Sequence, residues 1–219
     1  MIGSWLEPSN CGPLVFRDLG ATVPSSPPKA VFLDRDGVLN EAVPDPDSGL
    51  PESPLAVEDV RLIPGAARAA RELADTGHLL VCVSNQPGAA KGKVPVEQLL
   101  AVHERVLELL ADDGARLDCS CLCLHHPDGS VPELSVACSC RKPGPGLLLR
   151  AAEILGLDCR ASWMIGDTDA DLQAGQAAGC RVLRIEYPRT THKRSGRSSA
   201  DVRAVDLAAG VLQLFDLSV

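Results

Sequence analysis

The chain is poor in aromatic residues and has no long apolar run. Aromatic side chains make up 3% of its 219 residues, whereas hydrophobic residues together make up 45%. The core must therefore be built mainly from Ala, Val, Leu and Ile. No stretch approaches the roughly 18 consecutive apolar residues of a membrane span, and the first twenty residues lack the basic start and apolar run of a signal peptide. We expect a cytoplasmic protein with no membrane partner.

Positive charge is also scarce, since the chain has 21 Lys and Arg but 29 Asp and Glu, which gives a formal net charge of −8. Such a balance argues against nucleic acid as a general partner. It leaves room for a small anionic substrate, because a metal ion and a few cationic side chains can reverse the potential in one cleft. The nine Cys are expected to be thiols or metal ligands, since disulfides are rare in the cytoplasm.

Short apolar segments alternate with amphipathic ones along the chain. The pattern predicts strands at 30–34, 78–85, 117–126, 162–167 and 181–185, and helices at 64–77, 95–113, 144–156, 170–179 and 206–214. This alternation indicates an α/β fold, a three-layer Rossmann-like parallel sheet with helices on both faces.

The remaining segments suggest one domain with no large cap. Residues 1–28 are rich in Pro and Ser and predict an irregular N-terminal extension, followed by a single domain over 29–219. The Pro-rich loop 41–59 is too short to form a separate cap domain. The basic stretch 189–199 predicts a mobile loop.

Polar and charged residues follow the predicted strands, where ligands bind in sheets of this kind. They are Asp34, Asp36, Ser84, Asn85, Arg141, Lys142, Asp167, Asp169 and Asp171. Asp34 and Asp167 would repel each other unless they shared a cation, and oxygen ligands with room for water favour Mg²⁺ over Zn²⁺. One oxygen of Asp34 would remain free to attack phosphorus. Ser84 and Lys142 would hold the phosphoryl oxygens.

The arrangement DRDGVLN, SNQPG, RKPGPG, GDTDAD resembles the four motifs of the haloacid dehalogenase superfamily over about residues 29–186. The resemblance implies that Asp34 is the nucleophile that forms an aspartyl-phosphate. It also implies that Asp36 is the general acid/base, with its backbone carbonyl on Mg²⁺, and that Asp167 is the second Mg²⁺ carboxylate. Lys142 would stabilise charge, and Asp171 would be a supporting carboxylate. Ser84 and Asn85 fall on the phosphate-binding motif.

A second metal signal comes from two closely spaced pairs, Cys123 with His125 and Cys138 with Cys140. In an extended segment, residues two apart face the same way. Two such pairs give a Cys₃His set, which suits tetrahedral Zn²⁺ with no open position, and hence a structural site that stabilises the loop. Two alternatives remain open: Cys119 or Cys121 could replace Cys123, or the cysteines could pack as small hydrophobes.

The pairing of this loop with DRDGVLN narrows the resemblance to the D-glycero-D-manno-heptose 1,7-bisphosphate 7-phosphatases and the related histidinol-phosphate phosphatases. It implies a monoester hydrolase in heptose biosynthesis that acts on a phosphosugar. The expected sugar and phosphate contacts are Arg35, Asn40, Ser84, Asn85, Gln86, Arg141 and Lys142. We expect a monomer. Histidinol phosphate remains an alternative substrate, and a non-catalytic zinc-stabilised binding module remains an alternative function.

The chain departs from this pattern in a few places. Pro87 stands where a small polar residue is common, and Thr168 stands where a basic residue is common. The loop 41–59 is longer than expected and is predicted to lie over the substrate. These departures affect which sugar and anomer we expect the protein to bind, and they leave the expected phosphoryl chemistry unchanged.

Overall fold

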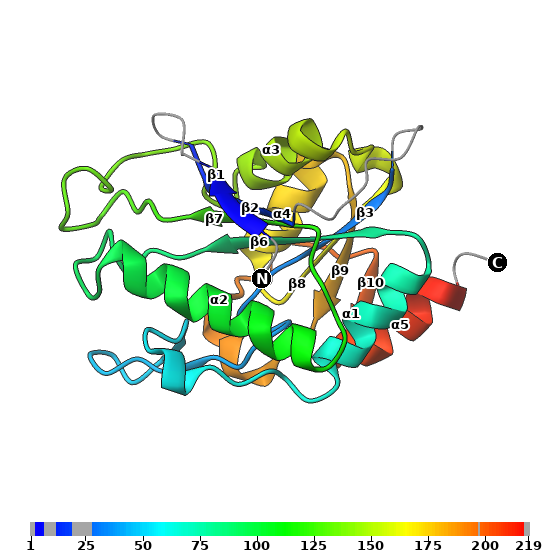
Figure 1. Ribbon diagram of the computed structural model, residues 1–219, viewed down its shortest axis with the longest axis horizontal. Coiled ribbons are helices and arrows are strands. Elements are labelled where there is room, and N and C mark those ends of the chain that lie inside the picture. Colours follow the sequence, from blue (N-terminus) through cyan, green and yellow to red (C-terminus); the bar gives the residue numbers. More distant parts are fainter. Residues whose placement is uncertain (1–2, 7–11, 19–27, 197, 217–219) are drawn as a thin grey trace.

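The structure is a computed structural model that describes residues 3–6, 12–18, 28–196 and 198–216. An eight-stranded sheet crosses the molecule in the order β1-β2-β7-β6-β3-β8-β9-β10 (Figure 1). Its strands are β1 (Gly3–Leu6), β2 (Leu14–Asp18), β3 (Ala30–Leu33), β6 (Leu79–Asn85), β7 (Cys119–Cys123), β8 (Trp163–Gly166), β9 (Arg181–Ile185) and β10 (Val202–Ala204). All neighbours from β7 to β10 are parallel, whereas β1 and β2 add antiparallel pairs.

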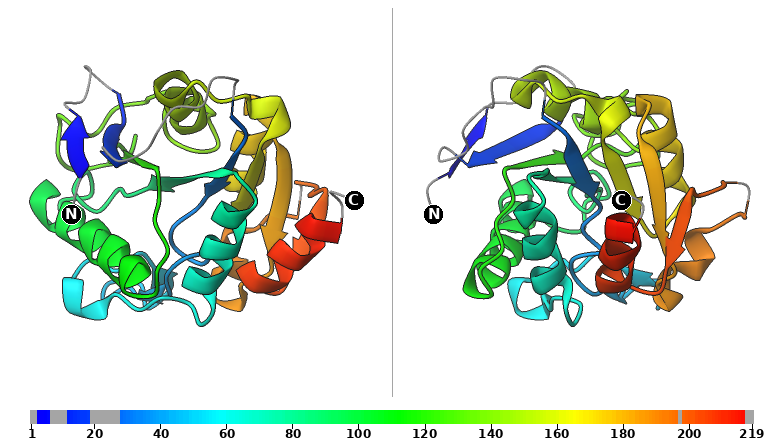
Figure 2. Two further views of the ribbon diagram at one scale, coloured as in Figure 1. Left: turned by 45° about the vertical axis from the view of Figure 1, so that its right-hand side comes forward. Right: turned by 90° about the vertical axis from the view of Figure 1, so that its right-hand side faces the viewer.

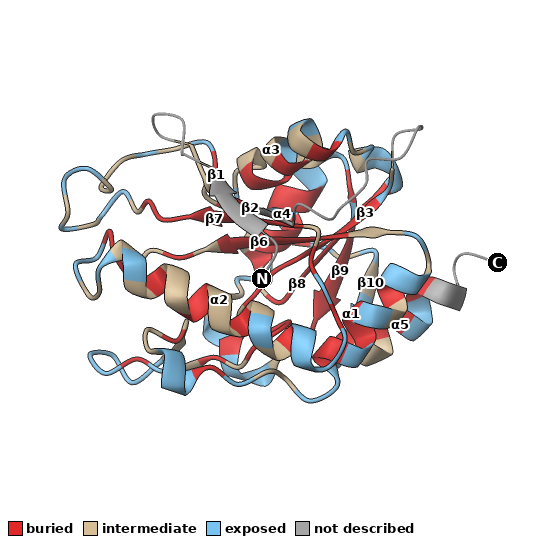
Figure 3. Cartoon of the chain, viewed as in Figure 1, coloured by how far each residue is buried: buried red, intermediate tan, exposed pale blue. Residues whose placement is uncertain are grey.

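Helices cover both faces of this sheet. They are α1 (Ala66–Asp75), α2 (Val96–Asp112), α3 (Gly146–Leu155), α4 (Asp169–Ala178) and α5 (Leu207–Asp216). One core cluster joins α1, α2 and α5 to the sheet, and a second joins α3 and α4 to it. Successive strand residues serve opposite faces, as Leu33 in the first cluster and Phe32 in the second demonstrate. Figure 3 shows the buried strands between helices that are buried only on their inner sides. The predicted three-layer α/β fold is therefore confirmed.

The strand order reverses beside β3, and this reversal positions the site. The chain leaves β3 to form β6 and β7 on one side, then returns to form β8 and β9 on the other. The carboxyl ends of β3, β6 and β8 consequently meet at a switch point, where ligands bind in open α/β sheets.

The N-terminal segment differs from the prediction of an irregular extension. Residues 3–6 and 14–18 form β1 and β2, and β2 pairs with β7, for example Phe16 with Ser120. The physical reason is that β7 would otherwise expose an unpaired edge. Figure 2 shows this addition at one side of the sheet. Residues 7–11 and 19–27 lie outside the described part of the chain, so the rest of that prediction is untested.

Two loops contain more structure than their composition suggested. In the 41–59 loop, β4 (Val43–Pro44) and β5 (Pro51–Glu52) form a small hairpin, followed by the 3₁₀ helix η1 (Val57–Asp59). The basic 189–199 segment begins with the 3₁₀ helix η3 (Pro188–Lys193) and continues to β10, which the sequence analysis did not predict. Another 3₁₀ helix, η2 (Cys159–Ala161), precedes β8. Among the described residues, no helix is both long and apolar enough to cross a membrane.

Candidate active site and metal centres

Asp34 and Lys142 meet at the end of β3. The Asp34 amide donates to the Ile165 carbonyl at 2.9 Å, which fixes this residue beside β8. The Lys142 ammonium lies 2.8 Å from Asp34 Oδ1 and 2.6 Å from Asp171 Oδ1, and it donates to the Val83 carbonyl at 2.7 Å. Burial lowers the pKa of Lys142, but the charges of Asp171 and Asp34 outweigh burial and raise the pKa above its ordinary value. The lysine is therefore a fixed cation.

Three carboxylates converge on this point. Ligand atoms of Asp34, Asp167 and Asp171 lie within 4.8 Å of one another, and all three residues are buried. Burial, then the charge of Asp171, raises the pKa of Asp34 to about 6. Burial, then the charges of Asp171 and Asp34, raises the pKa of Asp167 well above its ordinary value. Three acidic groups thus face a single lysine, an arrangement that a divalent cation would stabilise.

Asp167 offers an oxygen that suits such a cation. Among the described residues, its Oδ1 atom is buried and has no hydrogen-bond partner, whereas its Oδ2 accepts from the Thr190 hydroxyl. A buried carboxylate oxygen without a partner is costly unless it ligates an ion. The donor set and the orphaned oxygen together fit Mg²⁺.

Asp171 contributes to this cluster and to helix α4 at once. It is the third residue of α4, and its Oδ2 accepts from the backbone N–H of Thr168 at 2.9 Å and from the Thr168 hydroxyl at 2.6 Å. This capping box fixes Oδ1 towards Lys142. The sequence analysis gave Asp171 only a supporting role. In the structure it lies with Asp34 and Asp167 as a candidate metal ligand.

Asp36 points into a cage of donors. Its carboxylate accepts from Arg35 at 3.1 Å, Asn40 at 2.9 Å, Ser53 at 2.8 Å and Gln86 at 2.7 Å. Burial raises the pKa of Asp36, but the charge of Arg35 and these hydrogen bonds outweigh burial and lower the pKa below its ordinary value. The cage therefore holds Asp36 as a carboxylate.

Three of the residues expected to contact the substrate belong to this cage. Arg35, Asn40 and Gln86 are each 0% exposed. Their side chains bind Asp36 and, in one further bond of 2.8 Å, Arg35 donates to Gln86. In this structure they hold Asp36, and the sugar contacts expected of them remain a prediction. Neighbouring positions after a strand point in different directions, and only the fold shows which of them face inward.

A cavity of about 240 Å³ opens above these groups. Asp34, Asp36, Ser84 and Lys142 line its reactive end, together with Asn85, Asp171 and Thr190. Three further cations line it, namely Lys91, Arg141 and Lys193. Glu52 also lines the cavity and pairs with Lys193 at 2.7 Å. Lys91, Arg141 and Lys142 remain as cations suited to an anionic phosphorylated ligand.

Asn85 and Arg141 line the cavity and also hold its frame. The Asn85 side chain donates to the Lys142 carbonyl at 2.9 Å and accepts from the Lys142 amide at 3.0 Å, so both of its polar atoms are engaged. Arg141 donates to the His125 carbonyl at 3.2 Å and so connects the cavity to the Cys-rich loop. These two bonds fix the Asn85 side chain against the Lys142 backbone, and the phosphate contact expected of Asn85 remains a prediction.

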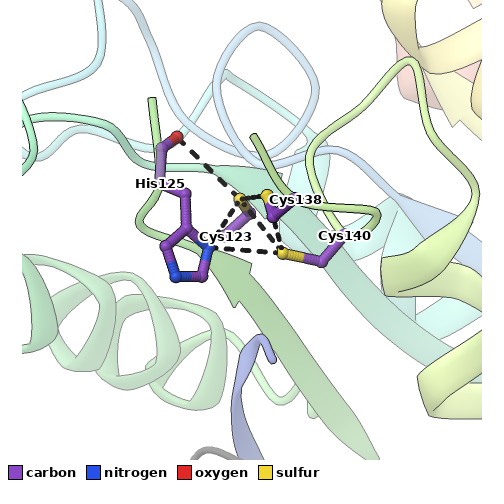
Figure 4. A group of neighbouring side chains, drawn as sticks. All are labelled: Cys123, His125, Cys138 and Cys140. Atoms are coloured by element: carbon purple, nitrogen blue, oxygen red, sulfur yellow. Dashed lines mark hydrogen bonds between the residues drawn. The ribbon is translucent and has the colours of Figure 1, made fainter. Parts of the chain in front are cut away.

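The four predicted zinc ligands lie together in one cluster (Figure 4). The sulfur atoms of Cys140 and Cys123 are 3.3 Å apart, as are those of Cys140 and Cys138, and Cys123 to Cys138 is 3.7 Å. His125 Nδ1 is 3.5 Å from the Cys140 sulfur. A tetrahedron with Zn–S bonds of about 2.3 Å has S–S edges of about 3.8 Å. The Cys123–Cys138 separation of 3.7 Å matches this edge, and the two separations of 3.3 Å are somewhat shorter.

The structure also favours Cys123 over the other candidate cysteines. Cys119 and Cys121 are fully buried in the core cluster beneath α3 and are not in the ligand group. A hydrogen bond with Cys140 is the main cause that lowers the pKa of Cys123, to about 5. A thiolate is the form of cysteine that binds a metal. The cluster could thus hold zinc, with all four positions taken by protein atoms.

Two residues beside the site were not found from the sequence. Ser53, in the 41–59 loop, donates to Asp36, and Thr190, in η3, donates to Asp167. Neither belongs to a motif, and their sequence distance from Asp36 and Asp167 gives no periodic signal. Only the folding of both loops over the cavity brings them there.

Gly37 leads to a prediction about site geometry. It has a φ of +88°, and a Cβ built on it would lie 2.6 Å from Asp167 Cγ. Gly37→Ala should therefore lower the free energy of unfolding by about 3 kcal/mol or more, through backbone strain and displacement of Asp167. Gly49 is the matched control, since its φ is +69° but no atom lies within 4 Å. Gly49→Ala should cost only about 1 kcal/mol in urea unfolding. Equal costs would contradict the close approach.

Comparisons with known proteins agree with this geometry. Residues 139–208 match the family model described as HAD-hydrolase-like. The chain is 43% identical over 175 residues to the D-glycero-beta-D-manno-heptose-1,7-bisphosphate 7-phosphatase of Yersinia pestis, covering 78% of this chain and 87% of that protein. It is 38% identical over 166 residues to the enzyme of the same name from Rhodopseudomonas palustris, covering 76% and 87%.

A solved structure is similar over most of both chains. It is the D,D-heptose 1,7-bisphosphate phosphatase from B. bronchiseptica, complexed with magnesium and phosphate, with a TM-score of 0.71, 29% identity and coverage of 86% of this chain and 99% of that one. The shared fold, the sequence identity and the coverage lead to one assignment. The chain belongs to the D-glycero-D-manno-heptose-1,7-bisphosphate 7-phosphatase family of the haloacid dehalogenase superfamily.

Proposed function

We propose that the protein is a Mg²⁺-dependent phosphatase that removes the 7-phosphate of D-glycero-D-manno-heptose 1,7-bisphosphate, in the biosynthesis of nucleotide-activated heptose. The observation that carries the proposal is the meeting of Asp34, Asp167 and Asp171 with Lys142 at the end of a cation-lined cavity. We take the beta anomer as the preferred substrate, because the relatives described above are named for it.

Asp34 and Asp167, with the backbone carbonyl of Asp36, would hold the Mg²⁺. When bound, the ion neutralises negative charge on the phosphoryl oxygens and on the carboxylates around it. Ser84, the backbone amides that follow it and Lys142 bind and orient the phosphoryl group. Lys142 is well suited to this role because it is buried and held by three acceptors.

The chemistry proceeds in two displacements. An Asp34 oxygen attacks phosphorus, the bond from phosphorus to the sugar oxygen breaks, and that oxygen takes a proton from Asp36. Water then attacks the aspartyl-phosphate and gives a proton to Asp36, and phosphate leaves as the Asp34 carboxylate is restored. The donor cage favours the ionised form of Asp36 that accepts the proton. A nearby phosphoryl dianion raises the pKa of Asp36 again, which favours the proton-donating form.

The Cys₃His cluster is proposed as a structural zinc site held by Cys123, His125, Cys138 and Cys140. Its physical support is the short separation of three sulfur atoms and one imidazole nitrogen, which would fill the four positions of a tetrahedral ion. Arg141 and Lys142 follow Cys140 directly, so the ion would fix the start of the segment that enters the cavity. We further propose that the protein acts as a monomer.

A substrate panel tests the proposed function. Phosphate release would be measured with Mg²⁺ for the alpha and beta heptose bisphosphates, fructose 1,6-bisphosphate and histidinol phosphate. We expect kcat/KM to be highest for the beta heptose bisphosphate, with release of one phosphate per molecule. A higher kcat/KM for histidinol phosphate would make that compound, and not the heptose bisphosphate, the substrate. No phosphate release from any compound would favour a non-catalytic binding module.

A further inference from the structure

The segment after β9 folds back against the reactive end of the cavity. It begins with η3, in which Thr190 is 2% exposed and lines the cavity beside Asp171. The Thr190 hydroxyl has a single proton and two neighbouring acceptors, Asp167 Oδ2 and the Tyr187 carbonyl at 3.2 Å. The carboxylate is the closer and the charged acceptor, so it receives the proton.

Other contacts hold this segment in place independently of Thr190. Arg194 donates to the backbone carbonyl of Asp167 at 2.7 Å. The Ser195 amide and hydroxyl both donate to Asp169 at 2.6 Å, and Asp169 in turn pairs with the buried Arg184 at 2.5 Å. The contacts of Arg194 and Ser195 therefore fix the segment that carries Thr190, so the Thr190 hydroxyl can orient Asp167.

The two oxygens of Asp167 have different environments. Oδ2 is engaged by Thr190, whereas Oδ1 is buried and has no partner among the described residues. Asp167 also contributes a carboxylate oxygen to the cluster with Asp34 and Asp171. Without the Thr190 bond, repulsion from those two carboxylates would favour rotation of Asp167 away from them. The bond at Oδ2 opposes this rotation.

We propose that Thr190 is a positioning residue that holds Asp167 with one oxygen directed at the magnesium site. This inference rests on the proposed function, since it concerns the same cation. It assigns a role to a residue outside the four motifs, on a loop that the sequence analysis described only as basic and mobile. Outer hydrogen bonds to metal ligands commonly affect metal affinity in this way.

The test compares Mg²⁺ binding in the absence of substrate. Thr190→Val removes the hydroxyl at nearly constant volume and should weaken Mg²⁺ binding about 10- to 100-fold. The measurement is calorimetric titration, with the Mg²⁺-dependent rise in Tm as a second readout. Thr190→Ser keeps the hydroxyl and should stay within about threefold of the parent. Thr191→Val is the matched control, because Thr191 is an exposed residue of η3 whose hydroxyl donates to the Pro188 carbonyl and not to the site.

Activity supplies a further distinction. The rate of Thr190→Val should recover as Mg²⁺ is raised, because the defect lies in metal affinity and not in the reacting groups. Unchanged Mg²⁺ binding in Thr190→Val, or an equal loss in Thr190→Ser, would overturn the assignment of Thr190. If the parent protein itself bound no Mg²⁺ and released no phosphate, the proposed function would fail instead.

Discussion

Replacing Asp34 with Asn should abolish turnover, lowering phosphate release from the heptose bisphosphate by on the order of 10⁴- to 10⁶-fold, as removal of a catalytic nucleophile does elsewhere. The amide keeps the shape of the side chain but cannot form the acyl phosphate. The fold should survive, because burial and the charge of Asp171 already disfavour the ionised form of Asp34. Loss of activity with an unchanged Tm is therefore the expected result.

Asp47→Asn is the matched control for this experiment. The substitution makes the same chemical change in the 41–59 loop, where the Asp47 side chain is 74% exposed and pairs with Lys93. Its kcat should stay close to that of the parent. Acid quenching during turnover should trap phosphate on the Asp34 peptide of the parent and of Asp47→Asn, but not of Asp34→Asn. If Asp34→Asn kept near-normal activity, water would attack phosphorus directly and the covalent route would be wrong.

Loss of the Cys₃His metal should have the second large effect, on stability. Cys140→Ser removes a donor that lies 3.3 Å from two other sulfur atoms. Structural zinc can contribute about 10 kcal/mol or more, so even a loss of about 4 kcal/mol would lower Tm by roughly 10 °C in a chain of this size. Activity should fall as well, because Arg141 and Lys142 follow Cys140 and line the cavity.

Zinc content and Tm should be measured together for this variant. The parent is expected to carry about one zinc per chain, as a tetrahedral site requires, and Cys140→Ser none. Cys159→Ser is the control, since Cys159 lies outside the ligand cluster and should leave the zinc content unchanged. A chelator should reproduce the effect of Cys140→Ser on the parent. A parent with no zinc, and a Tm that a chelator does not change, would mean that these cysteines pack only as small apolar side chains.

The reactive core could be predicted from the sequence because its residues directly follow strands. Asp34 ends the apolar run of β3, and Asp167 ends that of β8. Parallel strands place their carboxyl ends at one edge, so both carboxylates had to approach each other once the sheet formed. The cluster of Cys123, His125, Cys138 and Cys140 was predicted for a similar local reason, the alternation of side chains in extended segments.

The roles of Arg35, Asn40 and Gln86 could not be predicted in this way. Their sequence positions beside Asp34 and Ser84 suggested substrate contacts, but all three are buried and surround Asp36. Whether a polar side chain faces a cavity or a neighbour depends on the turn that follows the strand and on the segments packed over it, which have no sequence period.

The sequence by itself determined the layered α/β fold, the order of the four motifs and the pairs of soft ligands, because each follows from the local periodicity of a strand or helix. The tertiary structure alone decided the pairing of β2 with β7, the donor cage around Asp36 and the approach of Ser53 and Thr190 to the site. These contacts join segments far apart in the chain. They depend on how loops fold over a completed sheet, for which neither composition nor spacing provides a signal.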